Sequence, residues 1–125
     1  MRENEIAKDV VNACYEIHRE LGSGLFESVY EEVLWDILLE IGYSIKRQVP
    51  VPIVFRGKEY GLGFRADFII EDTILVELKS VEKLTAVHFK QAMTYLKLLD
   101  LRLGLLINFN VGNIGEGIKR IANNL

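Results

Sequence analysis

Two amphipathic helices are predicted at the start of the chain. In residues 5–21 the apolar side chains recur every three or four positions, and Gly22 follows as a plausible helix stop. The same spacing recurs in residues 25–41, and Gly42 stands behind it. We therefore expect two consecutive helices, each burying one apolar face.

The middle of the chain changes to a two-residue period, which is typical of strands. Residues 44–49 and 51–56 form two short segments with β-branched side chains. Two prolines interrupt this part of the chain, so it is predicted to be a bent or edge strand. Residues 60–70 and 74–80 alternate between apolar and polar side chains, which predicts two half-buried strands.

The last third returns to mixed signals. Residues 85–99 have helical spacing, and residues 103–109 are almost entirely apolar, which suits a strand buried on both faces. Residues 116–123 predict a short final helix. The expected element order is ααββββαβα, a mixed α/β domain.

Composition limits the kind of protein. A chain of 125 residues predicts one domain, residues 1–125, and 50% hydrophobic with 26% charged residues excludes a wholly disordered chain. The apolar runs are too short to span a membrane. One cysteine and two histidines exclude a cysteine zinc cluster and a multi-histidine metal site. We expect a cytoplasmic protein that does not associate with membranes.

Charge is distributed unevenly along the chain. The net charge is −3, but residues 1–40 carry three bases and ten acids, whereas residues 41–125 carry twelve bases and eight acids. The basic excess after residue 40 leaves room for an anionic partner, and its predicted contacts are Lys83, Lys90, Lys97, Lys119 and Arg120.

Three charged side chains on two neighbouring predicted strands suggest a metal site. Glu77 and Lys79 share one face of their strand because side chains alternate, and Asp67 lies on the polar face of the preceding strand. Carboxylate oxygens suit a hard cation such as Mg²⁺, and a lysine beside them can stabilise charge on a phosphate oxygen. The alternative is that all three are solvated surface charges, since Glu-x-Lys triplets are common on exposed strands.

This site imposes a condition on the loop between the two strands. A two-residue turn at residues 71–72 would pair Asp67 with Val76 and put Asp67 and Glu77 on opposite faces. The metal site therefore requires an odd loop, such as Glu71-Asp72-Thr73, or a β-bulge.

Three motifs in order resemble a known nuclease group. Asp67, followed after nine residues by Glu77-Leu78-Lys79, looks like the metal site of the PD-(D/E)XK nuclease superfamily. The segment Gly24–Tyr30 matches the G-x-x-E-x-x-Y signature of one small-protein family in that superfamily, and Gln91–Tyr95 is similar to the Q-x-x-x-Y motif of its RecB-like branch. One departure is Ala66, which stands where the superfamily name has proline.

The resemblance implies a fold and a reaction. The fold would be a restriction-endonuclease-like core, a mixed central β-sheet flanked by helices, and the reaction would be hydrolysis of phosphodiester bonds in DNA or RNA. Asp67 and Glu77 would hold Mg²⁺ or Mn²⁺ with help from the Leu78 carbonyl. Lys79 would position the attacking water, and Glu27 would add a third acid.

The neighbouring helices supply further candidates. Gln91 and Tyr95 lie on one stripe of their helix with His88, and the motif makes the first two candidates for substrate contact, whereas His88 is interpreted as a boundary residue with satisfied hydrogen bonds. Glu27 has an alternative interpretation as a half-exposed acid that suits a helix N-terminus.

We interpret the sequence as a metal-dependent nuclease domain. The rival hypotheses are a domain of the same fold that binds nucleic acid or protein without cleaving it, and a purely structural α/β domain. A homodimer is plausible because one domain of this size covers little of a duplex.

Overall fold

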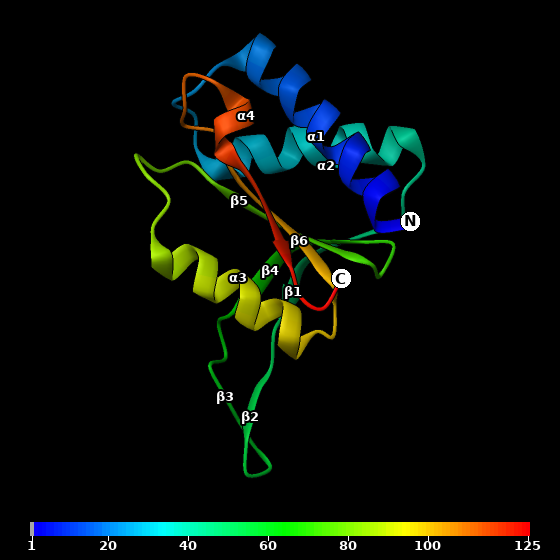
Figure 1. The fold of residues 1–125 in the computed structure, drawn as a ribbon, viewed down its shortest axis with the longest axis vertical. Coiled ribbons are helices and arrows are strands. Elements are labelled where there is room, and N and C mark those ends of the chain that lie inside the picture. Colours follow the sequence, from blue (N-terminus) through cyan, green and yellow to red (C-terminus); the bar gives the residue numbers. More distant parts are fainter. Residues whose placement is uncertain (1) are drawn as a thin grey trace.

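A five-stranded mixed sheet forms the centre of the computed structural model, which describes residues 2–125 (Figure 1). Its strand order is β1-β4-β5-β6-β7, and every neighbouring pair is antiparallel except β5 and β6, which are parallel. The strands are β1 (Ile45–Pro50), β4 (Arg65–Ile70), β5 (Ile74–Lys79), β6 (Leu103–Asn108) and β7 (Ile118–Ala122). The strand that contains Pro50 is thus an edge strand, as predicted.

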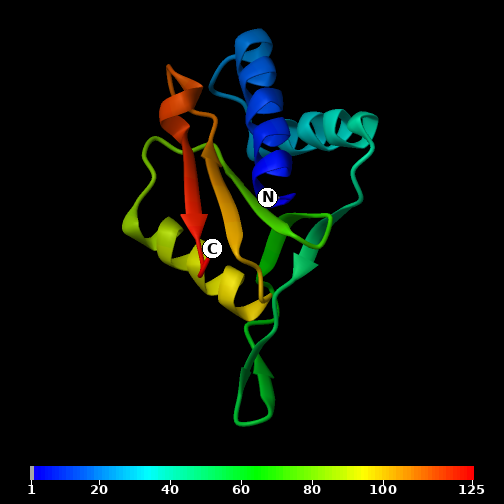
Figure 2. The ribbon, with the colours of Figure 1, turned by 45° about the vertical axis from the view of Figure 1, so that its right-hand side comes forward.

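Helices cover the two faces of this sheet. Helices α1 (Arg2–Leu21) and α2 (Glu27–Ile41) pack on one face, and α3 (Ala86–Leu98) lies across the other (Figures 1 and 2). Because side chains alternate along a strand, Val76 enters the core under α1 and α2, whereas Leu75 enters the core under α3. Two apolar layers therefore hold the sheet rigid from both sides.

The predicted mixed α/β fold, with a central sheet flanked by helices, is confirmed. Strand β5, helix α3 and strand β6 form a parallel βαβ unit, which explains why β6 is buried on both faces and almost entirely apolar. Within residues 2–125, no helix has the length and apolar character needed to cross a membrane.

The single strand predicted for residues 60–70 is wrong. The chain turns at Gly61, which has a φ of +68°, and the amide groups of Gly63 and Phe64 donate to its carbonyl oxygen. The turn separates β4 from β3 (Lys58–Tyr60), which instead pairs with β2 (Ile53–Phe55). This separate hairpin projects away from the body of the molecule (Figures 1 and 2).

The final helix predicted for residues 116–123 is also wrong. Helix α4 is only four residues long (Ile114–Gly117), and the chain continues as β7. Two glycines in this short segment disfavour further helix, and antiparallel pairing with β6 satisfies backbone groups that would otherwise be left open at the sheet edge. The observed order is ααβββββαβαβ rather than ααββββαβα.

Replacing Gly117 with alanine is expected to destabilise the fold. A methyl group there would lie well inside contact distance of the backbone carbonyl oxygen of Asn108, which cannot move without disturbing the end of β6. We expect Gly117→Ala to lower the free energy of unfolding by on the order of 2 kcal/mol, measured by urea denaturation. Gly112→Ala is the matched control, because a methyl group at Gly112 meets no atom within 4 Å. Equal stability of the two variants would contradict this packing argument.

Candidate active site

The loop between β4 and β5 has the odd length that a metal site requires. It consists of residues 71–73, and the register pairs Phe68 with Val76 and Ile70 with Ile74. Continuing that register places Asp67 opposite Glu77, on the face of the sheet that α3 covers. The predicted loop is confirmed, and the two carboxylates lie on one face.

The carboxylates of Asp67 and Glu77 are bound by each other's strands. The backbone amide of Asp67 donates to Oε2 of Glu77 at 2.8 Å, and the backbone amide of Leu78 donates to Oδ2 of Asp67 at 2.8 Å. The strands pair through backbone atoms as far as Phe68 and Val76, and at the next position these side-chain bonds take over. Hydrogen bonds from backbone amides to these two carboxylates thus replace the backbone ladder at this position.

Burial disfavours the state in which both carboxyl groups of this pair are ionised. The side chain of Glu77 is only 4% exposed, and burial together with the negative charge of Asp67 raises the pKa of Glu77 to about 8. The pKa of Asp67 is also raised, chiefly by burial and then by the negative charge of Glu31. At neutral pH and without a cation, the pair therefore retains a proton.

Lys79 completes one charged row along β5. It lies two residues beyond Glu77, hence on the same face, at the carboxyl end of the strand. Its side chain is half-buried, and its positive charge acts to lower the pKa of both Asp67 and Glu77. The row therefore presents two carboxyl groups and one ammonium group side by side.

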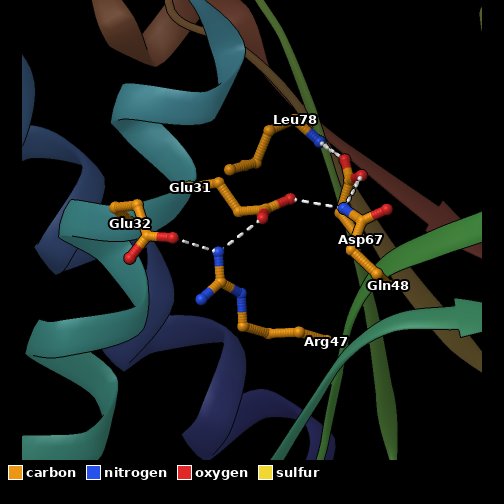
Figure 3. Close-up of polar contacts among 6 residues, drawn as sticks. All are labelled: Glu31, Glu32, Arg47, Gln48, Asp67 and Leu78. Carbon is orange, nitrogen blue, oxygen red and sulfur yellow. Dashed lines mark hydrogen bonds and ion pairs between the residues drawn. The ribbon is translucent and has the colours of Figure 1, made fainter.

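A third acid reaches this row from α2 through a glutamine. The amide nitrogen Nε2 of Gln48 donates to Oε1 of Glu31 at 2.7 Å and to Oδ1 of Asp67 at 3.3 Å (Figure 3). Gln48 has a φ of +49° within β1, a left-handed conformation that is uncommon for a side chain of this kind. Arg47 binds Glu31 from the other side at 2.7 Å. The third acid is thus held near the pair rather than in contact with it.

The comparison with known families follows this geometry. A family model described as the PD-(D/E)XK nuclease superfamily matches residues 4–121. The chain belongs to the PD-(D/E)XK nuclease superfamily. No curated protein and no solved structure matches it. Members of this superfamily are generally nucleases that use divalent metal ions, which agrees with the paired acids on β4 and β5.

The Tyr30 side chain of the G-x-x-E-x-x-Y segment serves the fold. It is fully buried, stacks on Phe109 with ring centroids 4.2 Å apart, and donates a hydrogen bond to the carbonyl oxygen of Gly22 at 2.6 Å. The hydroxyl of Ser80 donates to the carbonyl oxygen of Leu25 at 2.6 Å. These contacts fix the start of α2 beside the carboxyl end of β5.

Glu27 is the first residue of α2 and is exposed. It precedes Glu31 by one helical turn, so both acids share a face of α2. The anchoring of Leu25 to Ser80 brings this turn toward Lys79, but the structure places Glu31, rather than Glu27, in the hydrogen-bonded group around Asp67.

Helix α3 brings Tyr95 over the acid pair. Tyr95 is 4% exposed, and its pKa is raised by burial and by the negative charges of Glu77 and Asp67. Gln91 lies one turn earlier on α3 and is half-buried. His88 forms a capping box with Thr85, whose backbone amide donates to Nδ1 of His88 at 2.9 Å. The interpretation of His88 as a satisfied boundary residue is confirmed.

The donor set fits a hard divalent cation, although the described residues do not assemble a complete set of ligands. Across residues 2–125, no three acidic, histidine or cysteine side chains converge closely enough to hold a metal ion. Asp67 and Glu77 nevertheless offer adjacent carboxylate oxygens, and their mutual repulsion is the kind that a cation relieves. Further oxygen ligands must come from backbone, water, substrate or a shifted acid on α2.

The predicted basic surface is not a single face. Lys119 is opposite Leu106 on the α3 side of the sheet, whereas Arg120 is opposite Leu105 on the α1 side, where it donates to Oδ1 of Asn4 at 2.6 Å. Adjacent residues on a strand point to opposite faces, so Lys119 and Arg120 do not lie on one face of the sheet.

Sequence reasoning missed Glu31 and Gln48. Glu31 had a weak signal, because it is four residues after Glu27 and therefore lies on the same face of α2. Gln48 had none, because nothing in the sequence around it specifies a left-handed conformation within a strand.

The buried acid pair predicts an unusual pH dependence for the metal-free protein. The pKa of Glu77 is raised from its ordinary value of 4.5 to about 8, so the native state binds more protons than the unfolded state between these values. The free energy of unfolding should therefore decrease as pH rises across this range, by on the order of 1 kcal/mol or more. Urea denaturation in EDTA measures it. Glu77→Gln should flatten the profile, and an equally steep profile in that variant would contradict the assignment.

Proposed function

We propose that this protein is a metal-dependent nuclease that hydrolyses phosphodiester bonds in DNA or RNA. The observation that supports this most is the row formed by Asp67, Glu77 and Lys79 on one face of two adjacent strands, with both carboxylates bound by backbone amides. We further propose that the chain is a member of the GxxExxY family within the RecB-like branch, on the basis of the segments 24–30 and 91–95.

Asp67 and Glu77 hold Mg²⁺ or Mn²⁺ in this proposal, and the Leu78 carbonyl oxygen adds a backbone ligand. Such a cation, when bound, acts as a Lewis acid on a phosphoryl oxygen and offsets the charge of the two carboxylates. Glu27 or Glu31 supplies the acid from α2. Glu31 is nearer in the hydrogen-bond network, and it would have to leave Arg47 to join the pair.

Lys79 acts on the water and on the charge that develops at phosphorus. The water oxygen forms a bond to phosphorus, the bond from phosphorus to the leaving oxygen breaks, and the water proton leaves to solvent or to a carboxylate. The ammonium group orients the water and stabilises the additional negative charge on the phosphoryl oxygens. It donates only and cannot ligate a cation, so its contribution falls on the transition state.

Gln91 and Tyr95 face the same side of the sheet from α3 and are proposed to contact the substrate strand. The charges of Glu77 and Asp67 help to raise the pKa of Tyr95, and this proximity supports the proposal that its hydroxyl contacts a phosphate near the acids. Gln91, one turn away and half-buried, offers an amide to the next part of the strand.

Divalent cations should stabilise the protein through the acid pair. Mg²⁺ or Mn²⁺ binds the native state only, so each should raise the melting temperature in a concentration-dependent manner, and the increase should grow with pH as Glu77 loses its proton. In the double variant Asp67→Asn with Glu77→Gln, the increase should disappear. Differential scanning fluorimetry over a metal titration measures this.

Acids on α2 provide the controls for that titration. Asp36→Asn alters an exposed acid farther along α2, outside the network of Arg47 and Glu31, and should keep the full metal response. Glu27→Gln and Glu31→Gln, tested separately, identify which acid of α2 contributes. A full metal response in the Asp67/Glu77 double variant would place the metal site elsewhere.

Lys79→Ala should separate catalysis from binding. Removal of one preorganised electrostatic donor should lower the single-turnover cleavage rate by about 10²-fold or more, because that donor acts mainly in the transition state. The metal-induced rise in melting temperature should persist. Binding of nucleic acid, measured with Ca²⁺ in place of Mg²⁺ to block cleavage, should change much less than the rate.

The substrate panel for this experiment includes single-stranded, duplex and branched DNA and RNA. Undiminished cleavage by Lys79→Ala would remove this lysine from the mechanism. Binding without cleavage by the wild-type protein, with every metal and substrate, would instead support a non-catalytic domain that binds nucleic acid.

A further inference from the structure

The β2–β3 hairpin exposes apolar and aromatic side chains that the fold itself does not use. The hairpin and its flanks, residues 51–65, are called the arm here; it extends from the body of the molecule beyond the ends of β1 and β4 (Figures 1 and 2). Leu62 is 87% exposed and Phe55 is 61% exposed. An isolated two-stranded hairpin is only marginally stable in water, and exposed apolar patches commonly mark binding sites. The apolar surface that the arm leaves outside the core therefore indicates a binding role.

A pocket lies at the base of the arm. Its volume is about 390 Å³, and Pro52, Tyr60, Leu62, Phe64 and Arg65 form part of its lining. This size is within the range of small-ligand pockets, and the mixture of rings, an aliphatic chain and a guanidinium suits a flat aromatic group that carries a negative charge.

The pocket is close to the acid pair. The ring of Phe64 meets the ring of Tyr95 edge to face, with centroids 6.5 Å apart, and Tyr95 is the residue that lies over Asp67 and Glu77. Arg65 is two residues before Asp67 on β4, so the two side chains share a face and their backbones are ~7 Å apart along the strand. A group in the pocket and a phosphate at the acids would therefore belong to neighbouring parts of one molecule.

The net positive charge of the arm favours a negatively charged ligand. The arm carries three bases, Arg56, Lys58 and Arg65, and one acid, Glu59, a net +2 in a chain whose total is −3. Arg65 forms no ion pair within residues 2–125, and neither do Arg56 and Lys58, which lie over the rings of Phe55 and Tyr60 at 5.1 and 5.3 Å. A two-fold dimer formed through the arms would bring these like charges together, which disfavours a second copy as the occupant.

We propose that the arm and its pocket bind an unpaired nucleotide of the nucleic-acid substrate. The base stacks among Tyr60, Leu62 and Phe64, the phosphates lie on Arg65 and the basic residues of the hairpin, and the strand continues to Asp67 and Glu77. Glu59, the acid in the pocket lining, can accept hydrogen bonds from the exocyclic amino group of cytosine or adenine. Stacking requires a base that is not paired, so the substrate class is single-stranded or locally opened nucleic acid. This inference rests on the proposed nuclease function and adds a substrate class to it.

Binding isotherms with Ca²⁺ in place of Mg²⁺ test the arm without cleavage. A labelled single-stranded oligonucleotide should bind more tightly than a blunt duplex of the same sequence. Tyr60→Ala should weaken single-strand binding by about fivefold or more, the loss expected for one stacked base, and should leave duplex binding nearly unchanged. Tyr15→Ala is the matched control, because Tyr15 and Tyr60 are both 47% exposed and Tyr15 lies on α1.

A charge variant tests two basic residues of the hairpin that do not line the pocket, although Lys58 lies over the ring of Tyr60. In Arg56→Ala with Lys58→Ala, the slope of log affinity against log salt should become shallower by about 0.7 for each phosphate that the variant no longer neutralises. Arg19→Ala, an exposed base on α1, should leave the slope unchanged. An oligonucleotide with a photoreactive halogenated base should crosslink to Tyr60 or Phe64, which locates the base even if a variant disturbs the hairpin.

The proposal fails if Tyr60→Ala binds single strands like the wild type, or if crosslinks map away from the arm. It also fails if Tyr60→Ala dissociates a dimer in sedimentation while oligonucleotide binding is unchanged, which would make the arm an interface between copies. Each of these results leaves the nuclease proposal standing if Lys79→Ala still lowers the cleavage rate as expected. Arm-dependent binding without any wild-type cleavage would overturn only the nuclease proposal.

Discussion

The structure around the candidate site depends on two adjacent carboxyl groups, Glu77 buried and Asp67 half-buried, that repel each other when both are ionised. Asp67 and Glu77 are tied to adjacent strands by backbone amides, and the apolar layers under α3 and under α1 and α2 keep those strands in place. Sheet and helices therefore hold two carboxyl groups close together, and burial with the negative charge of Asp67 raises the pKa of Glu77, so that the metal-free pair retains a proton at neutral pH. In the proposed function, a cation would bind at this pair and relieve the repulsion between the two carboxylates.

Much of the arrangement of the acid pair could be predicted from the sequence, because it follows from the alternation of side chains along a strand. Side chains alternate on a strand, so the requirement that Asp67 and Glu77 share a face fixed the loop between them to an odd length, and the three-residue loop at 71–73 agrees. The helical segments were predictable for the same kind of reason, because their apolar periods extend over many turns. The alternation of residues 60–70 is an exception, because the turn at Gly61 interrupts it.

The features that escaped prediction depend on contacts between distant segments. Residues 118–122 become a strand because β6 offers an open edge, which the local sequence does not reveal. The break at Gly61 depends on close packing of the Phe64 ring, and of Ile53 on the paired strand β2, against a glycine that has no side chain. Gln48 adopts a left-handed conformation where Glu31 on α2 and Asp67 on β4 both accept from its amide. In each case the decisive partner lies elsewhere in the chain, so only the folded structure identifies it.

The network of Gln48, Glu31 and Arg47 suggests how one fold accommodates both the free and the metal-bound site. In the free site, the positive charge of Arg47 and the amide of Gln48 pair with Glu31, whose negative charge raises the pKa of Asp67. A cation at Asp67 and Glu77 would compete with Arg47 for the same carboxylate, and Arg47 retains Glu32 as a second partner at 2.6 Å. Glu31 is thus the acid with an alternative position within reach, whereas Asp67 and Glu77 are fixed by the backbone. In the proposed function, the rigid pair would define the position of the cation, and Glu31 on α2 would adjust to it.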